Sequence, residues 1–524
     1  HVDVSFVIRD VGHRKGADQG VEMQGVIASA RLENFWAGEA SGFEIVEVAE
    51  IDRTVVNVAE AVDDFSSLFR AVWAPHFIVT AYPFGRMCTP LGDGEWLDQR
   101  HYRFAGPFVQ IVLHTRRQNL VERGMSVAVC EKGVIAGEAS GRAVAFVEYE
   151  LLSSIKMELI ARSIELWRAM PARIGRDIGF NDKGLATLYA DKEQAEVTAS
   201  WLESMQGQPG IEARMLSAAE IAELDPAFGS NWSSGLFQTN GASLEPRLAA
   251  PAIAEAAQEK GVKILQGCAV RDIERAAGKI VGVVTEKGGI KAPNVLISSG
   301  VWSPMLTQLL GLELPQLMIF SEILSIEPVS GGPKIDGMTP AGYFRREPDG
   351  GYSFNAADGA IPITPTIIKH LRALMAMEMD VDQDMRPVLS VSTFLRELRG
   401  AKLKSPHKRS TFEKHRILQP ALAGRAAKDV AENMGQYIPA FRDGRVRERS
   451  SGALMASIDN LGVISAVASI PGLFIGSGML YGVTMAAATG EALADMITGK
   501  EPEIDVTPYR YERFIDGSPI KFHP

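Results

Sequence analysis

The sequence predicts an α/β protein in which a doubly wound, parallel-sheet domain carries a second, mostly antiparallel α+β domain. Residues 125–130 form a short apolar run, partly β-branched, that ends in Glu131, at the sheet edge where doubly wound folds hold a nucleotide ribose. Residues 471–495 read as a strand followed by a small-residue helix. Residues 316–327 and 342–354 read as a long apolar strand and a hairpin, which favours an antiparallel second domain. Taken alone, the first run also fits an αβ unit of any α/β protein.

Composition narrows the class of protein. A chain of 524 residues with 46% hydrophobic and 23% charged residues is expected to form two or more domains. Its net charge of −10 argues against a general nucleic-acid binder. Cys88, Cys130 and Cys268 form no CxxC pair, so we expect neither a disulfide framework nor a metal site. No apolar run reaches the roughly 18 to 20 residues of a membrane span, and no signal pattern opens the chain, so a cytoplasmic location is expected.

The first part of the chain gives the fewest signals. Residues 43–62 alternate and then turn acidic, which is typical of a strand followed by a helix. We interpret residues 1–101 as an N-terminal extension of unknown role, either an appendage or a subunit-contact segment.

Helical signals dominate the next part. The spacing of apolar residues predicts an amphipathic helix over 153–170, ended by Pro171. Residues 179–201 read as a strand followed by a helix. Ser217 and Glu220 have the spacing of a capping box at the start of a helix that Pro226 ends.

Strands follow a further helix over residues 243–260. They are expected at 262–264, 268–270, 280–285 and 294–300. Ser299 and Gly300 are small enough to let the backbone pass close to a flat ligand, and Trp302 after them is either part of that turn or core filler.

Two regions with charged side chains each allow two interpretations. Arg345, Arg346 and Tyr352 lie on the predicted hairpin, where exposed strand side chains are one interpretation; the other, contact with a ligand, depends on the resemblance of FRREPDGGY to the substrate domain of the family named below. The basic stretch 396–416 is typical of a solvated face, although it could also dock an acidic partner subunit.

Several segments together resemble the D-amino-acid-oxidase-like flavoproteins, the group of glycine oxidase, sarcosine oxidase and amino-acid dehydrogenases. The segments are RGMSVAVCEKG with GEASGR, LSAAEIAELDP, Ser299–Ser303, and residues 449–467 and 471–495, in the family's order. The resemblance covers about residues 119–514. It implies an FAD-binding, Rossmann-like domain and a substrate domain, and we assign residues 102–180, 241–315 and 445–505 to the first, 181–240 and 316–444 to the second, and 506–524 to a tail.

The same resemblance implies site residues. Cofactor contacts carried over from the family, running from the ribose, phosphates and adenine to the flavin ring, are Glu131, Lys132, Ser140, Arg142, Val270, Gly300, Trp302, Gly478, Gly482 and Thr484. Arg346 and Tyr352 are the substrate-binding candidates. Because FAD carries the chemistry in this family, no catalytic side chain is named.

The chain departs from the family at one motif. Counting back from Glu131 places the three phosphate-loop glycines of the family at Phe108, Gln110 and Leu113, and a Cβ there blocks close approach to the pyrophosphate. Two hypotheses follow. One is an FAD-dependent oxidoreductase that oxidises the C–N bond of an amino acid or secondary amine by hydride transfer to flavin, with oxygen or another acceptor taking the electrons. The other is a degenerate, non-catalytic scaffold subunit of the same fold in a hetero-oligomer.

Overall fold

The computed structural model describes residues 2–8, 26–33, 42–50 and 125–524, apart from 356–358, 377–384, 401–407 and 421–425. Residues 1–98 with 387–389 form one compact unit, and the other residues form a second. In the first unit, β1 (Val2–Ile8), β2 (Val26–Glu33) and β3 (Gly42–Glu50) form an antiparallel sheet in that order. β3 contains part of the strand predicted after residue 43. The helix expected behind it, Cys88 and the loop at 108–113 lie outside the described residues.

Parallel strand pairs form the centre of the second unit. β4 (Ala128–Cys130) pairs with β10 (Lys263–Leu265), and β14 (Val295–Ile297) pairs with β23 (Leu473–Ser477). β22 (Val463–Ala466) joins the other edge of β23 in the antiparallel direction. These strands confirm the parallel-sheet domain, and both β4 and β14 end at the cavity described below.

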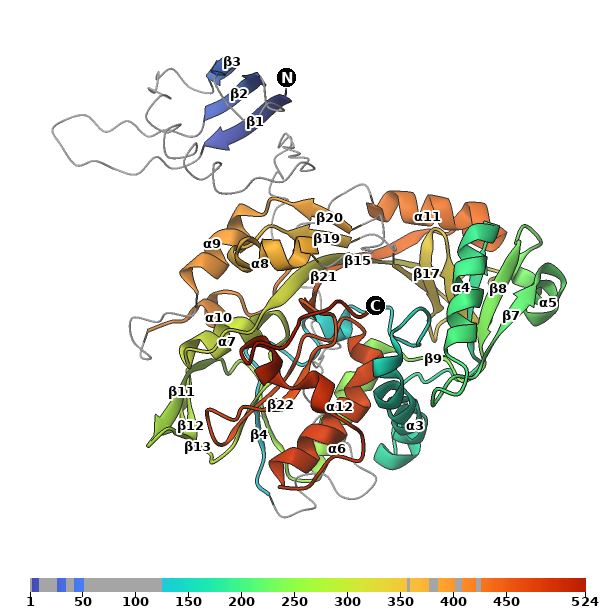
Figure 1. Ribbon diagram of the computed structural model, residues 1–524. Helices are drawn as coiled ribbons and strands as arrows, with labels where there is room; N and C mark the ends of the chain where they lie inside the picture. The colour runs from blue at the N-terminus through green and yellow to red at the C-terminus, as the bar shows by residue number, and fades with distance from the viewer. Residues whose placement is uncertain are drawn as a thin grey trace, which may run out of the picture. The chain divides into compact units, whose positions relative to one another are not determined.

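Helices pack against this centre (Figure 1). α12 (Gly482–Ile497) lies against α3 (Met157–Ile174), and their apolar faces share one buried core with α6 (Pro246–Glu259). The prediction that Pro171 ends α3 is wrong, since the helix continues to Ile174. The helix ends instead at Gly175, whose positive φ of 64° suits a left-handed cap that binds the Pro171 carbonyl.

The predicted helix starts were correct at two further places. Asp191 caps α4 (Lys192–Ser204) by accepting a hydrogen bond from the Glu193 amide. Ser217 and Glu220 form the predicted capping box at the start of α5 (Ala218–Leu224).

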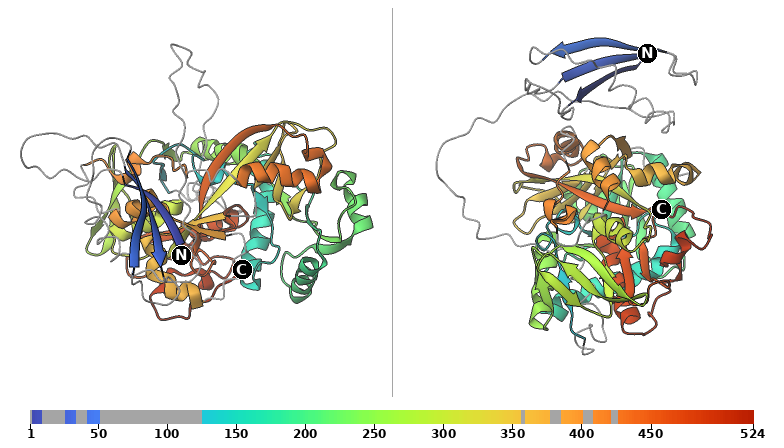
Figure 2. Two further views of the ribbon diagram at one scale, coloured as in Figure 1. Left: turned by 90° about the horizontal axis from the view of Figure 1, so that it is seen from above. Right: turned by 90° about the vertical axis from the view of Figure 1, so that its left-hand side faces the viewer.

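The largest sheet has ten strands within the described residues; β16 pairs with β6 in parallel, and the pairs of β15 with β18, β19 and β21, of β17 with β16 and β18, and of β8 with β6 and β7 are antiparallel. Its order is β20-β19-β15-β18-β17-β16-β6-β8-β7, with β21 along β15. Figure 2 shows the long curved strands β15 and β21 running together, paired from Gln316–Ser457 to Ser325–Glu448, with a register shift before the last pair, Ile326–Val446. The bounds are β6 Leu185–Tyr189, β7 Ala213–Ser217, β8 Ser234–Gln238, β15 Gln316–Ile326, β16 Asp336–Thr339, β17 Gly342–Arg346, β18 Tyr352–Asn355, β19 Gly359–Pro362, β20 Met385–Val388 and β21 Val446–Ser457. β17 and β18 are the predicted hairpin, and the sheet confirms the antiparallel character of the second domain.

Shorter elements complete the described chain. They are β5 Phe146–Val147, β9 Ala242–Ser243, β11 Val270–Ala276, β12 Lys279–Thr285, β13 Gly288–Lys291, α7 Ser303–Leu309, α8 Pro365–Ala376, α9 Val391–Arg399, α10 Thr411–Lys414 and α11 Ala426–Tyr437.

The end of the basic stretch 396–416 is packed rather than solvated. Arg416 forms an ion pair with Glu286, Nη2 to Oε2 2.6 Å, and its backbone carbonyl accepts a hydrogen bond from Lys132. The reading of the whole stretch as a solvated face is therefore wrong for its carboxyl end.

A short connection links the large sheet to the parallel centre. β21 ends at Ser457 and β22 begins at Val463. Between them Asp459 is buried and makes a two-pronged ion pair with Arg513, at 2.6 Å from Nε and 3.0 Å from Nη2. Arg513 also donates to the carbonyl of Gly462, 2.7 Å away. An ion pair and a hydrogen bond from one arginine therefore hold the connection in place.

Candidate functional site

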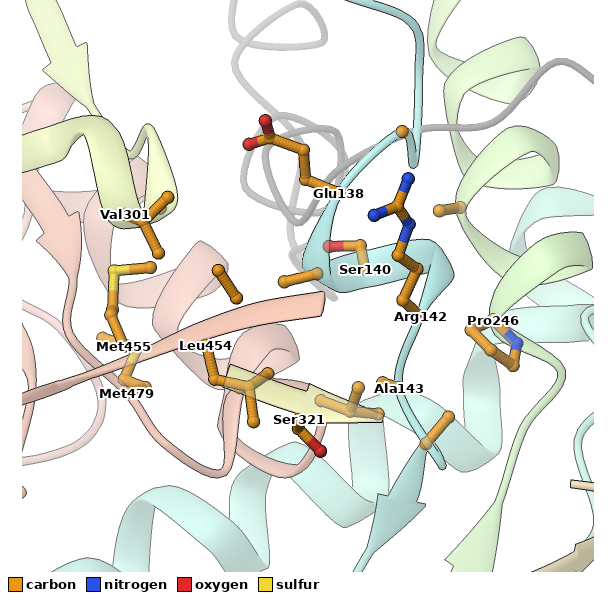
Figure 3. Close-up of a pocket in the computed structure, with 18 of the residues that line it drawn as sticks. Glu138, Ser140, Arg142, Ala143, Pro246, Val301, Ser321, Leu454, Met455 and Met479 are labelled. Carbon is orange, nitrogen blue, oxygen red and sulfur yellow. The ribbon is translucent and has the colours of Figure 1, made fainter. Parts of the chain in front are cut away.

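A cavity of about 360 Å³ extends from the end of β4 to the N-terminus of α12. Its walls come from β4, β5, α6, β15, β21 and α12, together with the turn at residues 299–302. Figure 3 shows Glu138, Ser140 and Arg142 together on one side, with Val301, Met455 and Met479 together on another. The cavity therefore has a polar and an apolar region.

Glu131 lies at the polar end, directly after β4. Its Oε1 accepts a hydrogen bond of 2.7 Å from the Gly133 amide, and its own amide donates to the Leu265 carbonyl at 2.9 Å. Burial raises the pKa of Glu131 to about 7. Among the described residues no donor reaches Oε2, so one oxygen is available to a ligand hydroxyl.

Lys132 is held by protein acceptors. Its Nζ donates to Glu138 Oε1 at 2.7 Å and to the carbonyls of His415 and Arg416. It also lies 4.5 Å from the ring centroid of Trp302, whose Nε1 donates to Glu138 Oε2 at 2.9 Å. Burial lowers the pKa of Lys132. Lys132 and Glu138 thus fix the Trp302 ring at the cavity wall.

Arg142 follows the short 3-10 turn Ala139–Gly141, which carries Ser140. Its Nη1 donates to the carbonyls of Leu418 at 3.1 Å and Ser451 at 2.6 Å, and burial lowers its pKa. In the described part of the chain its Nε and Nη2 have no acceptor. These two nitrogens are the groups through which Arg142 could bind an anion.

Small residues shape the other end. Gly300 has a φ of +59°, and a Cβ there would lie 3.3 Å from Met455 Cε. Gly482 begins α12, and a Cβ there would meet nothing within 4 Å. The Thr484 hydroxyl accepts from the Glu148 amide and donates to the Phe146 carbonyl, both at 3.2 Å. The helix N-terminus facing the cavity favours negative charge in a bound group.

The cavity brings together nine of the ten cofactor residues named from the sequence: Glu131, Lys132, Ser140, Arg142, Val270, Gly300, Trp302, Gly482 and Thr484. Gly478 does not line it, because its Cα faces Gln316 and Ser457, where a Cβ would lie 2.6 Å from Gln316 Nε2.

The two substrate candidates also lie elsewhere. Arg346 is exposed on β17, and Tyr352 is buried in the core behind β18, where its hydroxyl donates to the Pro333 carbonyl at 2.6 Å. Neither lines the cavity.

Sequence reasoning missed several lining residues, among them Glu138, Glu148, Tyr343, Asn355 and Met455. Glu138 lies within the GEASGR segment, so its motif carried a signal. Glu148 stands in FVEYE, where two acids follow an apolar pair at alternate positions. This pattern alone does not indicate which acid faces the cavity.

The described residues fit a long, flat dinucleotide. The cavity offers a buried carboxylate at one end, glycines without a Cβ along its length, and a helix N-terminus at the other. In the part of the chain that the structure describes, no group of three or more His, Cys, Asp or Glu could hold a metal ion. No helix among the described residues is long and apolar enough to cross a bilayer.

Comparison with known proteins agrees with this geometry. A model of the FAD dependent oxidoreductase family matches residues 118–496. The chain is 27% identical over 197 residues to sarcosine oxidase subunit beta of Arthrobacter sp, covering 36% of this chain and 48% of that one. It is 23% identical over 410 residues to glycine oxidase of Pseudomonas putida, covering 75% and 94%. The chain spans about half the length of the sarcosine oxidase subunits that it matches.

A solved structure of L-amino acid deaminase from Proteus myxofaciens is similar with a TM-score of 0.73 and 29% identity, over 78% of this chain and 91% of the other. The family match covers most of the chain and includes β4, β5, α6, β15, β21 and all of α12 but its last residue, the elements that line the cavity. The chain therefore belongs to the FAD-dependent oxidoreductase family of D-amino-acid-oxidase type, whose cofactor is FAD.

Proposed function

We propose that the chain oxidises the C–N bond of an amino acid or a secondary amine, as a dehydrogenase or an oxidase. The observation that supports this most is the cavity that runs from Glu131 to the N-terminus of α12, because its lining joins the acid expected at a ribose to the helix end expected at a flavin ring. Bound FAD would supply the two-electron oxidation of the C–H bond next to nitrogen.

The chain's own residues divide the work of holding such a ligand. Glu131 would accept hydrogen bonds from the ribose, and Ser140 with Arg142 would hold the phosphate region. Val270, Gly300 and Trp302 would contact the adenine and the flavin ring. Gly482 and Thr484 would place the N-terminus of α12 near the flavin ring. The roles of Lys132 and Gly478 are indirect, since the first anchors Trp302 and the second lets β23 pass Gln316. Arg346 and Tyr352 stay predictions for substrate contact that would need movement of β17 and β18.

The experiment is an absorption spectrum of the purified full chain, followed by anaerobic addition of amino acids and secondary amines. We expect flavin bands that bleach with at least one of these compounds. Glu131→Gln removes a charge-assisted hydrogen bond and is expected to weaken FAD binding about tenfold or more. The matched control is Glu274→Gln on exposed β11, which should leave FAD binding unchanged. A colourless protein that takes up no added FAD contradicts the proposal.

A scaffold subunit is the second candidate, and two observations favour it. Phe108, Gln110 and Leu113 stand where the family has glycines, and two relatives are named as subunits of a sarcosine oxidase. This function predicts stable association with another chain and no flavin reduction. A flavin-loaded monomer that is reduced by an amine would contradict it.

A further inference from the structure

Glu148 is an acid that the cofactor contacts do not use. It follows β5 and lines the cavity next to the N-terminus of α12. Its amide is fixed by the Thr484 hydroxyl, which in turn donates to the Phe146 carbonyl. Within the described chain its carboxylate accepts no hydrogen bond and forms no ion pair, so both oxygens are available to a ligand.

A second acid lies behind it. Glu150, two residues on, is buried and does not line the cavity. Its carboxylate accepts hydrogen bonds from the hydroxyls of Thr187 and Tyr189. Glu150 forms no ion pair within the described residues, and burial raises its pKa, so neither acid has a basic partner. A cation placed in the cavity beside Glu148 would compensate both.

The basic side chains of the cavity are committed elsewhere. Lys132 is paired with Glu138, and Arg416 with Glu286. Arg142 donates its Nη1 to the Leu418 and Ser451 carbonyls, and its other nitrogens are the ones proposed above for the phosphate region. The region around Glu148 is otherwise apolar and aromatic, with Phe146 and Tyr343 in edge-to-face contact at 5.6 Å. Such a surrounding suits a compact organic cation.

We propose that Glu148 is the subsite for the protonated amine of the substrate, so that this site selects alkylammonium compounds by charge. The inference rests on the proposed function and names the residue that recognises its substrate class. A carboxylate there would bind the ammonium and then accept its proton. The N–H bond breaks, an O–H bond forms on Glu148, and the electron pair stays on nitrogen, which leaves the neutral amine.

Two further facts support this role. The pKa of Glu148 is raised to about 8 by burial and then by Glu150, so the carboxyl changes charge near neutral pH, as a proton acceptor needs. Tyr343 on β17 and Tyr481 before α12 are phenols and carry no positive charge. Arg345, also on β17, is a cation, but it is paired with Glu245 at 2.8 Å and donates to the Val144 carbonyl.

The test compares four probes of one shape and different charge on the flavin-loaded full chain at about pH 8.5, where an alkylamine is protonated. The probes are tert-butylammonium, tert-butanol, pivalate and 2-aminoisobutyrate, and neither amine has a hydrogen on the α-carbon that could be lost by oxidation. Titration calorimetry gives each dissociation constant. We expect tert-butylammonium to bind at least about tenfold more tightly than tert-butanol, and pivalate to bind more weakly than either.

Two variants at Glu148 test whether this residue causes the preference for the cation. Glu148→Gln keeps the size and removes the charge, and it should bring the ratio between tert-butylammonium and tert-butanol to about one. Glu148→Asp keeps the charge and should retain a preference for the cation. A preference that is unchanged in Glu148→Gln overturns the proposal, as does tighter binding of pivalate than of tert-butylammonium to the wild type. The second comparison needs no variant and holds even if Glu148→Gln does not fold.

Anaerobic reduction of the flavin is measured separately, so the two proposals can fail independently. A protein that prefers the cation through Glu148 but is reduced by no amine supports the ammonium subsite and contradicts the enzyme proposal. A protein that is reduced by an amine while Glu148→Gln keeps the cation preference supports the enzyme and overturns the subsite. Weaker binding of 2-aminoisobutyrate than of tert-butylammonium supports selection of amines over amino acids, and the reverse order overturns that selection.

Discussion

Replacement of Asp459 by Asn is expected to destabilise the protein strongly. The ion pair of Asp459 with Arg513 is 3% and 5% exposed, and Asp459 also accepts hydrogen bonds from the Ser457 hydroxyl at 2.6 Å and the Leu461 amide at 3.3 Å. Asn keeps the shape but leaves the Arg513 guanidinium as a buried charge without a counterion. Removing one partner of a buried pair costs about 3–5 kcal/mol. For a folded body of roughly 400 residues this corresponds to a lower midpoint of thermal unfolding by about 4–6 °C.

The assay is thermal unfolding followed by circular dichroism and, in parallel, by flavin release. The matched control is Asp516→Asn, which breaks an exposed ion pair with Arg510 at 3.0 Å and is expected to leave the midpoint unchanged. Both probes should shift together for Asp459→Asn, because the connection that Asp459 fixes continues directly from β21, one wall of the cavity. A shift of less than 1 °C, equal to that of the control, would show that the buried pair does not stabilise this connection.

Three more changes have defined outcomes. Glu148→Gln should stabilise the protein increasingly from about pH 4.5 to pH 8, because burial raises the pKa of the folded wild-type carboxyl to about 8, so that over this range the unfolded chain ionises first and the folded state loses stability relative to it; the limit is about 5 kcal/mol, and equal pH profiles in urea unfolding would contradict the assignment. Gly337→Ala places a Cβ 2.0 Å from the Ala186 carbonyl and should lower the thermal midpoint sharply, whereas Gly289→Ala on β13, with no heavy atom nearer than 4.0 Å, should not. Ser217→Ala removes the cap of α5 and should cost about 1 kcal/mol in the same unfolding assay, with no effect on flavin content.

Local signals in the sequence predicted the elements well. The capping box at Ser217 and the hairpin at 342–354 depend on neighbours within a few residues, and both are present. Pro171 misled the prediction because a proline within the last turn costs one hydrogen bond only, and Gly175 supplies a better end.

The site was predictable where a motif fixed the residue and not where distant segments decide its surroundings. Glu131 follows its strand as expected. The acceptors of Lys132 at His415 and Arg416, however, are more than 280 residues away, and no local pattern indicates them. Tyr352 is also placed by a distant residue, since its ring packs in the core against that of Phe441, with 4.7 Å between the ring centroids. The face of a strand residue depends on what packs against the sheet, and a single sequence does not give that.

The five residues between β21 and β22 constrain how a ligand can enter. Because β21 is paired along its length with β15, and β22 is paired with β23, the two sheets share one short covalent joint that is pinned by Asp459. A wide hinge opening at this joint would have to break the buried ion pair between Asp459 and Arg513. Access is therefore expected through rearrangement of side chains and loops at the cavity mouth, and mutations at the joint should alter how fast the cofactor leaves more than how substrates are chosen.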